Sequence, residues 1–341
     1  MSQNITRIGI DLAKNIFQLC AVDARGKVLF NKTIKRAKLK DFVANLPVCE
    51  VILESCASSN YWYQVFSQYG HDVKLINPAY VRPFVKTNKN DAADAEALCE
   101  AASRPTMRFV QPKTPRQQDV QLLHRVRARL VSRRTSLSNQ LRGLLAEYGI
   151  VITEGINNVR KQIPKILEDA ENDLSSTARA VFAQLYDELV EIDQRVNTLS
   201  KELTQVSNDS SRCKQFKTVY GIGPMVATAL YSVMGDPKHY KNGREFAAFL
   251  GLVPRQYSTG GKPKLGGISK RGDTQTRTLL IQGAQAALCR MHNRDDRLSR
   301  WACQIKKRRG HNIATVALAN KLARTCWAMA NNNTNFELKS V

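Results

Sequence analysis

A chain of 341 residues, 43% hydrophobic and 24% charged, can form two or three soluble domains, and no run of about 18 apolar residues predicts a membrane span. Its eight cysteines include no C-x-x-C pair and its first residues do not resemble a signal peptide, so we expect a cytoplasmic protein with reduced thiols and without disulfides or a zinc site. The net charge is +23, and residues 211–341 hold 23 Lys and Arg against 6 Asp and Glu, which indicates a nucleic-acid partner.

Short apolar runs alternate with helical patterns in the first hundred residues. Strands are predicted over 5–12, 17–22, 28–30, 51–53 and 73–76, and helices around 39–46, 60–69 and 92–102. An opening hairpin followed by alternating strands and helices predicts an α/β domain with a mixed sheet. We assign residues 1–112 to this domain.

Four acidic residues stand at distinctive places in this domain. Asp11 and Glu54 each end an apolar run, and Asp91 and Asp94 lie three apart at the start of a predicted helix. Acids at strand ends point out of the sheet edge, and acids at i and i+3 share one helix face. Such a set can hold a pair of Mg²⁺ ions about 3.5–4 Å apart, as in enzymes that cut phosphodiesters. The alternative is that each is an ordinary solvated acid, but the set as a whole favours a metal site.

The middle of the chain, residues 113–210, is predicted to be helical. A basic helical pattern covers about 115–148, a connecting segment 149–173, and a second long helix carries apolar residues at alternating spacings of four and three from Ala178 to Val206. That spacing predicts a four-heptad coiled-coil seam. The seam could join two chains, which we favour slightly, or pack within one chain as a helical hairpin.

Residues 211–341 form the third predicted domain, which is mainly helical. The run from Thr218 to Met234, with Gly221 and Gly223, resembles a helix-hairpin-helix whose backbone N–H groups contact a phosphate. An ordinary turn at the start of a helix, without any phosphate contact, would have the same sequence pattern. The apolar helix over 313–329 is predicted to be core, together with Trp301 and Trp327.

A second stretch with reactive side chains follows within this domain. Ser258 and Thr259 precede two glycines, and five cations lie close by in the sequence: Arg255, Lys262, Lys264, Lys270 and Arg271. The glycines allow close approach of a ligand, and the cations could contact a phosphate and its transition-state charge. The hydroxyl is then a candidate nucleophile on phosphorus. Equally, the segment could be a phosphate-gripping turn in which Ser258 only donates a hydrogen bond.

Taken together, both stretches resemble one known family. IGIDLAK, ILES, NKNDAADA, YGIGPMVATAL, FAAFLGLVPRQYSTGGK and GGISKRGD are similar to motifs of the insertion sequence 110 family of transposases, and the last two favour its 1111 subgroup. The resemblance covers about residues 5–330. It implies an N-terminal domain of RNase H or RuvC type, coiled-coil helices in the middle, and a C-terminal transposase domain that bears a serine.

The resemblance also implies the chemistry and the partners. The acidic set becomes Asp11, Glu54, Asp91 and Asp94 with Mg²⁺, and the serine falls at Ser258, with Thr259 as runner-up and Ser269 third. Members excise and insert their own element by recombination, and they act on double-stranded DNA at the element ends and at the target site. At least some are guided by a non-coding bridge RNA, and two subunits share each site in a dimer of dimers.

Two other functions remain open at this point. The protein could be a RuvC-like endonuclease that hydrolyses branched DNA with water, in which Ser258 is structural. It could also be a non-catalytic nucleic-acid-binding protein, although such a protein would be expected to lack one of the acids. We favour strand exchange through a covalent phosphoserine intermediate, with sequence specificity delegated to RNA pairing.

Overall fold

The computed structural model describes residues 4–86 and 90–337 of the chain. Contacts divide the chain into two compact units, Met1–Lys113 and Thr114–Val341. The region predicted as a separate middle domain therefore falls in the same unit as the C-terminal part. Within the described residues, no helix combines the length and the apolar character needed to cross a membrane.

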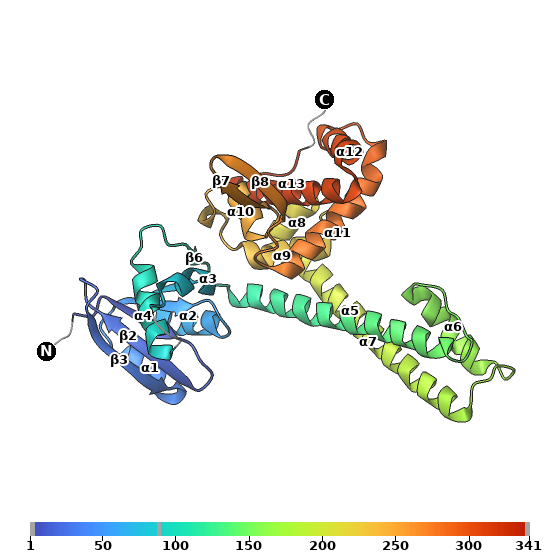
Figure 1. Cartoon of the computed structure of the whole chain (residues 1–341), viewed down its shortest axis with the longest axis horizontal. Coiled ribbons are helices and arrows are strands. Elements are labelled where there is room, and N and C mark those ends of the chain that lie inside the picture. Colours follow the sequence, from blue (N-terminus) through green and yellow to red (C-terminus); the bar gives the residue numbers. More distant parts are fainter. Residues whose placement is uncertain (1–3, 87–89, 338–341) are drawn as a thin grey trace. The chain divides into compact units, whose positions relative to one another are not determined.

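The N-terminal unit contains a six-stranded mixed sheet with the strand order β3-β2-β1-β4-β5-β6 (Figure 1). Strands β1, β4 and β5 are parallel, whereas β2, β3 and β6 each join antiparallel. Their bounds are β1 Arg7–Asp11, β2 Ile16–Val22, β3 Val28–Lys35, β4 Glu50–Glu54, β5 Asp72–Ile76 and β6 Phe109–Val110. The predicted mixed sheet is confirmed. Strand β3 runs further than its apolar residues indicated because its polar second half still pairs with β2.

Helices cover both faces of this sheet. They are α1 (Arg36–Ala44), α2 (Ser59–Gln68), α3 (Pro78–Val81) with a short 3₁₀ turn η1 (Arg82–Phe84), and α4 (Asp91–Ala102). On one face Phe17 and Ile10 pack with Trp62 of α2. On the other, Cys20 of β2 packs with Cys99 of α4. The alternation of side chains along each strand explains why one run of residues supplies both cores.

The C-terminal unit begins with a long helical hairpin. Helices α5 (Pro115–Ala146) and α7 (Ser176–Asp209) pack side by side, and α6 (Ile156–Glu168) closes their far end. Leu189 and Ile192 of the predicted seam are buried in one cluster with Leu137 and Leu141 of α5. Of the two alternatives, the structure therefore shows the seam packed within the chain. Whether the protein assembles into oligomers stays a prediction.

The rest of this unit is a helical core with one β-hairpin. The elements are α8 (Ser211–Lys217), α9 (Pro224–Met234), η2 (Pro237–His239), α10 (Gly243–Phe249), β7 (Pro254–Thr259), β8 (Lys262–Ile268), α11 (Thr274–Arg290), η3 (Met291–Asn293), α12 (Arg297–Arg309) and α13 (His311–Asn332). One face of helix α13 is buried in this core, as predicted, with Leu318 and Leu322 almost fully enclosed. The hairpin β7–β8 was not expected in a mainly helical region.

A buried histidine joins three helices of this core. His124 of α5 places Nε2 2.9 Å from the Thr228 hydroxyl of α9, and its backbone carbonyl accepts from Gln275 of α11 at 2.6 Å. Its Nδ1 is buried without a hydrogen-bond partner in the described structure. Burial, aided by the charge of Arg127 and opposed by Asp273, lowers the pKa of His124 to about 4.

We expect this histidine to make the fold sensitive to acid. The unfolded chain takes up the proton near pH 6.5 but the folded chain only near pH 4, so stability falls as pH drops through that window, by about 3 kcal/mol in total. His124→Gln keeps a hydrogen-bonding side chain near Thr228 but does not titrate, so it should remove the loss of stability that comes from His124. Urea unfolding midpoints at pH 7 and pH 4.5 test it, and an equal fall in both proteins would contradict the assignment.

Candidate active site

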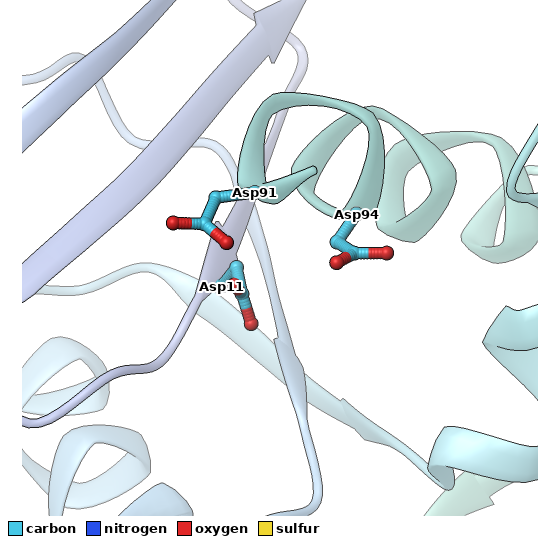
Figure 2. Close-up of side chains that lie close together, drawn as sticks. All are labelled: Asp11, Asp91 and Asp94. Atoms are coloured by element: carbon cyan, nitrogen blue, oxygen red, sulfur yellow. The ribbon is translucent and has the colours of Figure 1, made fainter. Parts of the chain in front are cut away.

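Three carboxylates meet at one edge of the N-terminal sheet. Asp11 ends β1, and Asp91 and Asp94 lie in the first turn of α4 (Figure 2). One carboxylate oxygen from each lies within 4.8 Å of the others. Asp91 is exposed and the other two are half-buried, so the cluster is open to solvent on one side. The structure thus brings together three of the four acids singled out in the sequence.

Glu54 lies at the same edge but outside this cluster. In the parallel pair of β1 and β4, Ile10 faces Leu53, so the next residues, Asp11 and Glu54, stand beside each other. Burial, with the charges of Glu54 and Asp11, raises the pKa of the Cys56 thiol to about 11. Both carboxylates therefore lie near that thiol, and Glu54 is placed to join the site from the neighbouring strand.

The position of α4 depends on a glycine in β1. A Cβ atom at Gly9 would lie 2.4 Å from the carbonyl oxygen of Ala95 and 3.1 Å from Leu98 Cβ, both on α4. Only glycine therefore lets the helix backbone rest directly on the strand. Since Gly9 is two residues before Asp11 and Ala95 follows Asp94, this contact brings the two acids together.

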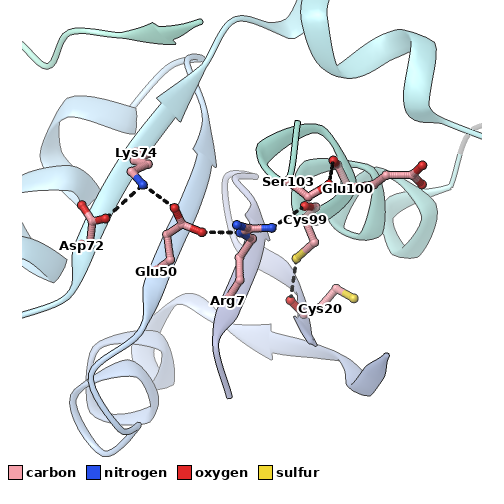
Figure 3. Close-up of polar contacts among 8 residues, drawn as sticks. All are labelled: Arg7, Cys20, Glu50, Asp72, Lys74, Cys99, Glu100 and Ser103. Carbon is pink, nitrogen blue, oxygen red and sulfur yellow. Dashed lines mark hydrogen bonds and ion pairs between the residues drawn. The ribbon is translucent and has the colours of Figure 1, made fainter. Parts of the chain in front are cut away.

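Polar contacts hold the other end of α4. At the start of the strands, Arg7 pairs with Glu50 and also donates to the carbonyl oxygen of Cys99 at 3.2 Å (Figure 3). Lys74 pairs with the same Glu50, and with Asp72 at 3.1 Å. The network therefore joins three parallel strands to the helix at the edge opposite the acids.

The first turn of α4 is fixed in the same way. The Asn90 side chain caps the helix by accepting from the N–H of Ala93 at 2.7 Å. Asn31 of β3 donates to the Ala92 carbonyl oxygen at 3.1 Å. The two aspartates thus sit on a capped helix N-terminus, where the helix dipole favours negative charge.

The donor set fits a hard divalent cation. Carboxylate oxygens are the ligands that Mg²⁺ prefers, and Mg²⁺ is usually held by one or two carboxylates while it keeps several waters. The open side of the cluster leaves room for those waters and for a phosphate oxygen. Asp11, Asp91 and Asp94 would hold the cation, and Glu54 stands next to them.

The second predicted site forms the exposed hairpin β7–β8. Gly260 and Gly261 have φ values of +56° and +73°, the signs that a two-residue type I′ turn requires. Thr259 and Lys262 form the pair next to that turn, and Ser258 and Pro263 form the following pair. The Ser258 hydroxyl accepts a hydrogen bond from Gln256 Nε2 at 2.8 Å. The candidate nucleophile is therefore at an exposed tip.

The register separates the serine from the nearest lysines. Residues paired across an antiparallel ladder share a face, and successive residues alternate. Ser258 therefore shares a face with Pro263, whereas Thr259 shares the other with Lys262 and Lys264. The sequence grouped these lysines with Ser258, whereas the structure places them on the face of Thr259, with Lys262 opposite Thr259 and Lys264 opposite Tyr257.

The remaining cations flank the hairpin's stems. Arg255 lies near the start of β7, and Lys270 and Arg271 follow the end of β8. Here the backbone segments touch: a Cβ at Gly251 would lie 2.2 Å from the Arg271 carbonyl oxygen. The buried guanidinium of Arg277 donates to the carbonyl oxygens of Leu250, at 3.1 Å, and Arg271, at 2.8 Å.

Arg277 is a residue that the sequence analysis missed. It contacts the segment before the hairpin and the segment after it, so it fixes where the Ser258 hairpin leaves the core. Ser269, the third candidate nucleophile, directly follows β8, and its N–H donates to the carbonyl oxygen of Val253, before β7, at 2.8 Å. A lone arginine in a helix carries no sequence signal for such a role.

The two glycines of the helix-hairpin-helix-like turn differ in their surroundings. Gly221, at φ +82°, approaches α11 so closely that a Cβ would lie 2.6 Å from the Gly283 carbonyl oxygen. Packing therefore explains this glycine. Gly223, which caps α9, would meet nothing within 4 Å and is open to a ligand.

Two family models match separate parts of the chain. A family model described as "Transposase IS116/IS110/IS902 family" matches residues 213–300, and a DEDD transposase model of the IS110 group matches residues 8–150. These ranges contain the Ser258 hairpin and the acidic cluster respectively.

Similar proteins align along nearly the whole chain. A probable family 20 transposase of Pseudomonas aeruginosa is 44% identical over 97% of this chain and 98% of its own length. The transposase for insertion sequence element IS1111A of Coxiella burnetii is 43% identical over 96% of this chain and 90% of its own. The transposase for IS1328 of Yersinia enterocolitica is 42% identical over 98% and 99%.

We expect Gly9→Ala to separate the acids. The added methyl group must push α4 away from β1, which should lower the free energy of unfolding by about 1–3 kcal/mol and weaken binding of Mg²⁺ or Mn²⁺. Calorimetric titration with Mn²⁺ and urea unfolding measure the two effects.

Gly143→Ala is the matched control, because nothing lies within 4 Å of a Cβ there. Gly143 lies within α5, where alanine should be neutral or stabilising by up to about 1 kcal/mol. Unchanged Mn²⁺ affinity in Gly9→Ala would show that the close approach does not position the acids.

Proposed function

The chain belongs to the IS116/IS110/IS902 family of transposases, enzymes that act on DNA, and from this premise we propose that it excises and inserts its element by strand exchange through a phosphoserine link at Ser258. The observation that carries the proposal is the cluster of Asp11, Asp91 and Asp94. An acidic site of this kind supports phosphoryl transfer.

In the proposed first step, Ser258 Oγ attacks the scissile phosphorus. A new Oγ–P bond forms, the P–O bond to the departing strand breaks, and that strand's sugar oxygen takes up a proton while the serine gives one to solvent. A divalent cation bound at the acids would supply charge stabilisation for the phosphate oxygens. The hydroxyl of a partner strand then attacks the phosphoserine, which restores the serine.

The chain's own residues have distinct parts in this scheme. Gln256 holds the Ser258 hydroxyl, and Arg255, Lys270 and Arg271 at the hairpin stems are proposed to contact the DNA backbone, as are Lys262 and Lys264 on its lysine-bearing face. Gly223 offers a backbone contact to phosphate at the start of α9. We also propose Mg²⁺ as the cation, a bridge RNA as guide and a dimer of dimers as the assembly, following the family resemblance.

Hydrolysis by water is the second candidate. The observation that favours it is the register of the hairpin, which leaves Ser258 on the face opposite Lys262 and Lys264. In that case the acids activate water, the protein acts as a structure-selective endonuclease, and no covalent intermediate forms.

Trapping the covalent intermediate distinguishes these functions. The full chain, with guide RNA and element-end DNA, should give an SDS-resistant protein–DNA adduct. Ser258→Ala should abolish it, with strand exchange reduced at least about a thousand-fold, as for loss of a covalent nucleophile. Thr259→Ala should retain the adduct, and Asp94→Asn should lose both adduct and cleavage.

Two results would contradict the assignment. An adduct that survives Ser258→Ala but is lost in Thr259→Ala would move the nucleophile to the neighbouring threonine. Cleavage by the unaltered protein without any adduct would favour hydrolysis.

A further inference from the structure

A groove of about 1460 Å³ lies in the C-terminal unit beside the base of the β7–β8 hairpin. One face of α13 forms its floor, and residues of α10, of α12 and of the hairpin from Leu265 to Ile268 form its walls. Small-molecule pockets commonly measure about 300–1,000 Å³. The groove is therefore large enough for a segment of polymer.

Its charge is entirely positive. Arg244, Arg309, Lys321 and Arg324 line it, and no acidic side chain is among the described residues that do so. Burial, together with the charges of Arg297 and Arg324, lowers the pKa of Lys321. A cation that lies among other cations and is partly removed from water is stabilised by an anionic ligand, and a phosphate group is such a ligand.

Part of its floor is apolar. Ile313, Val316 and Ala317 lie together on the groove-facing side of α13, Ala328 lies beyond Lys321 and Arg324 on the same helix, and Leu265 adds apolar surface from the hairpin. Ile313 is 48% exposed and Leu265 63%, which is unusual for large aliphatic side chains. An apolar floor between cations suits a ligand that has both flat apolar surfaces and negative charges.

Two tryptophans also line the groove, although the sequence predicted them to be core. Trp327 donates its indole N–H to the Pro237 carbonyl oxygen at 2.9 Å, which fixes the ring. Lys321 Nζ lies 4.2 Å from the centre of the Trp301 ring. Both rings are half-buried, so they pack on the core and still face the groove.

We propose that this groove binds single-stranded DNA next to the scissile phosphate, an inference that rests on the proposed function. A single strand exposes the flat faces of its bases, which the apolar floor and the tryptophans can cover while Arg and Lys contact the phosphates. A duplex stacks its base faces inside and gains little from an apolar floor. Because the hairpin that carries Ser258 forms one wall, the strand that the serine cuts has a direct path into the groove.

The test measures binding of the full chain to labelled oligonucleotides by fluorescence anisotropy. The probes are a 20-nucleotide oligo-dT, a 20-base-pair duplex and a 20-nucleotide oligo-rU. Lys321→Ala with Arg324→Ala should weaken oligo-dT binding at least about ten-fold and duplex binding less than about two-fold. Leu265→Ser, which removes only apolar surface, should also weaken oligo-dT binding selectively.

The matched control removes two charges elsewhere in the same unit. Arg195 and Lys201 are exposed on α7, and Arg195→Ala with Lys201→Ala should leave oligo-dT binding within about two-fold. Equal losses for oligo-dT and duplex would overturn the proposal in favour of general electrostatic attraction. Unchanged oligo-dT binding in the groove variants, or a loss confined to oligo-rU, would also overturn it.

Failure of the groove and failure of the serine mechanism are distinguishable. Ser258→Ala should bind oligo-dT as the unaltered protein does. A selective oligo-dT loss in the groove variants, without any adduct from the unaltered protein, would support the groove and contradict the covalent step. Normal oligo-dT binding in the groove variants alongside a serine-dependent adduct would contradict the groove alone.

Discussion

The close contact between Gly9 and α4 is the constraint on which the acidic site depends. Two backbones touch where any side chain would hold them apart, and the helix can then present two aspartates to the end of a neighbouring strand. Arg7 and Asn31 act on the same helix from its two ends, through hydrogen bonds to main-chain carbonyl oxygens. The acids themselves repel one another, so the geometry has to come from groups outside the cluster.

In the C-terminal unit, the hairpin that carries the proposed nucleophile Ser258 is positioned by a similar principle. Close backbone contacts at Gly251 and the buried guanidinium of Arg277 fix the two stems of the hairpin, and of the hairpin itself only Ile268, the last residue of β8, packs against the core. In both units, then, close main-chain contacts at a glycine determine where the candidate site residues lie.

The sequence predicted the sheet, the acids at its edge and the seam of α7, because each leaves a local pattern of apolar spacing. It did not predict the function of Gly9 or Arg277, since their partners lie more than 80 residues away for Gly9 and in two separate segments for Arg277. It also grouped Lys262 and Lys264 with Ser258. No strand was predicted in this stretch, and only in a strand do successive side chains point to opposite faces. Glu54 stands beside the cluster and not within it. The spacing of residues along the sequence does not predict how far a side chain extends at the edge of a sheet.

The exposed hairpin has a consequence for timing. Every residue from Pro254 to Gly267 is exposed, and an isolated two-stranded ribbon is marginally stable in water. Without a ligand, the tip that carries Ser258 therefore has only its ladder and its stems to order it. Under the proposed function, nucleic acid that covers either face of the hairpin would add a packed layer to it, and the Ser258 hydroxyl would be ordered by the substrate that it attacks.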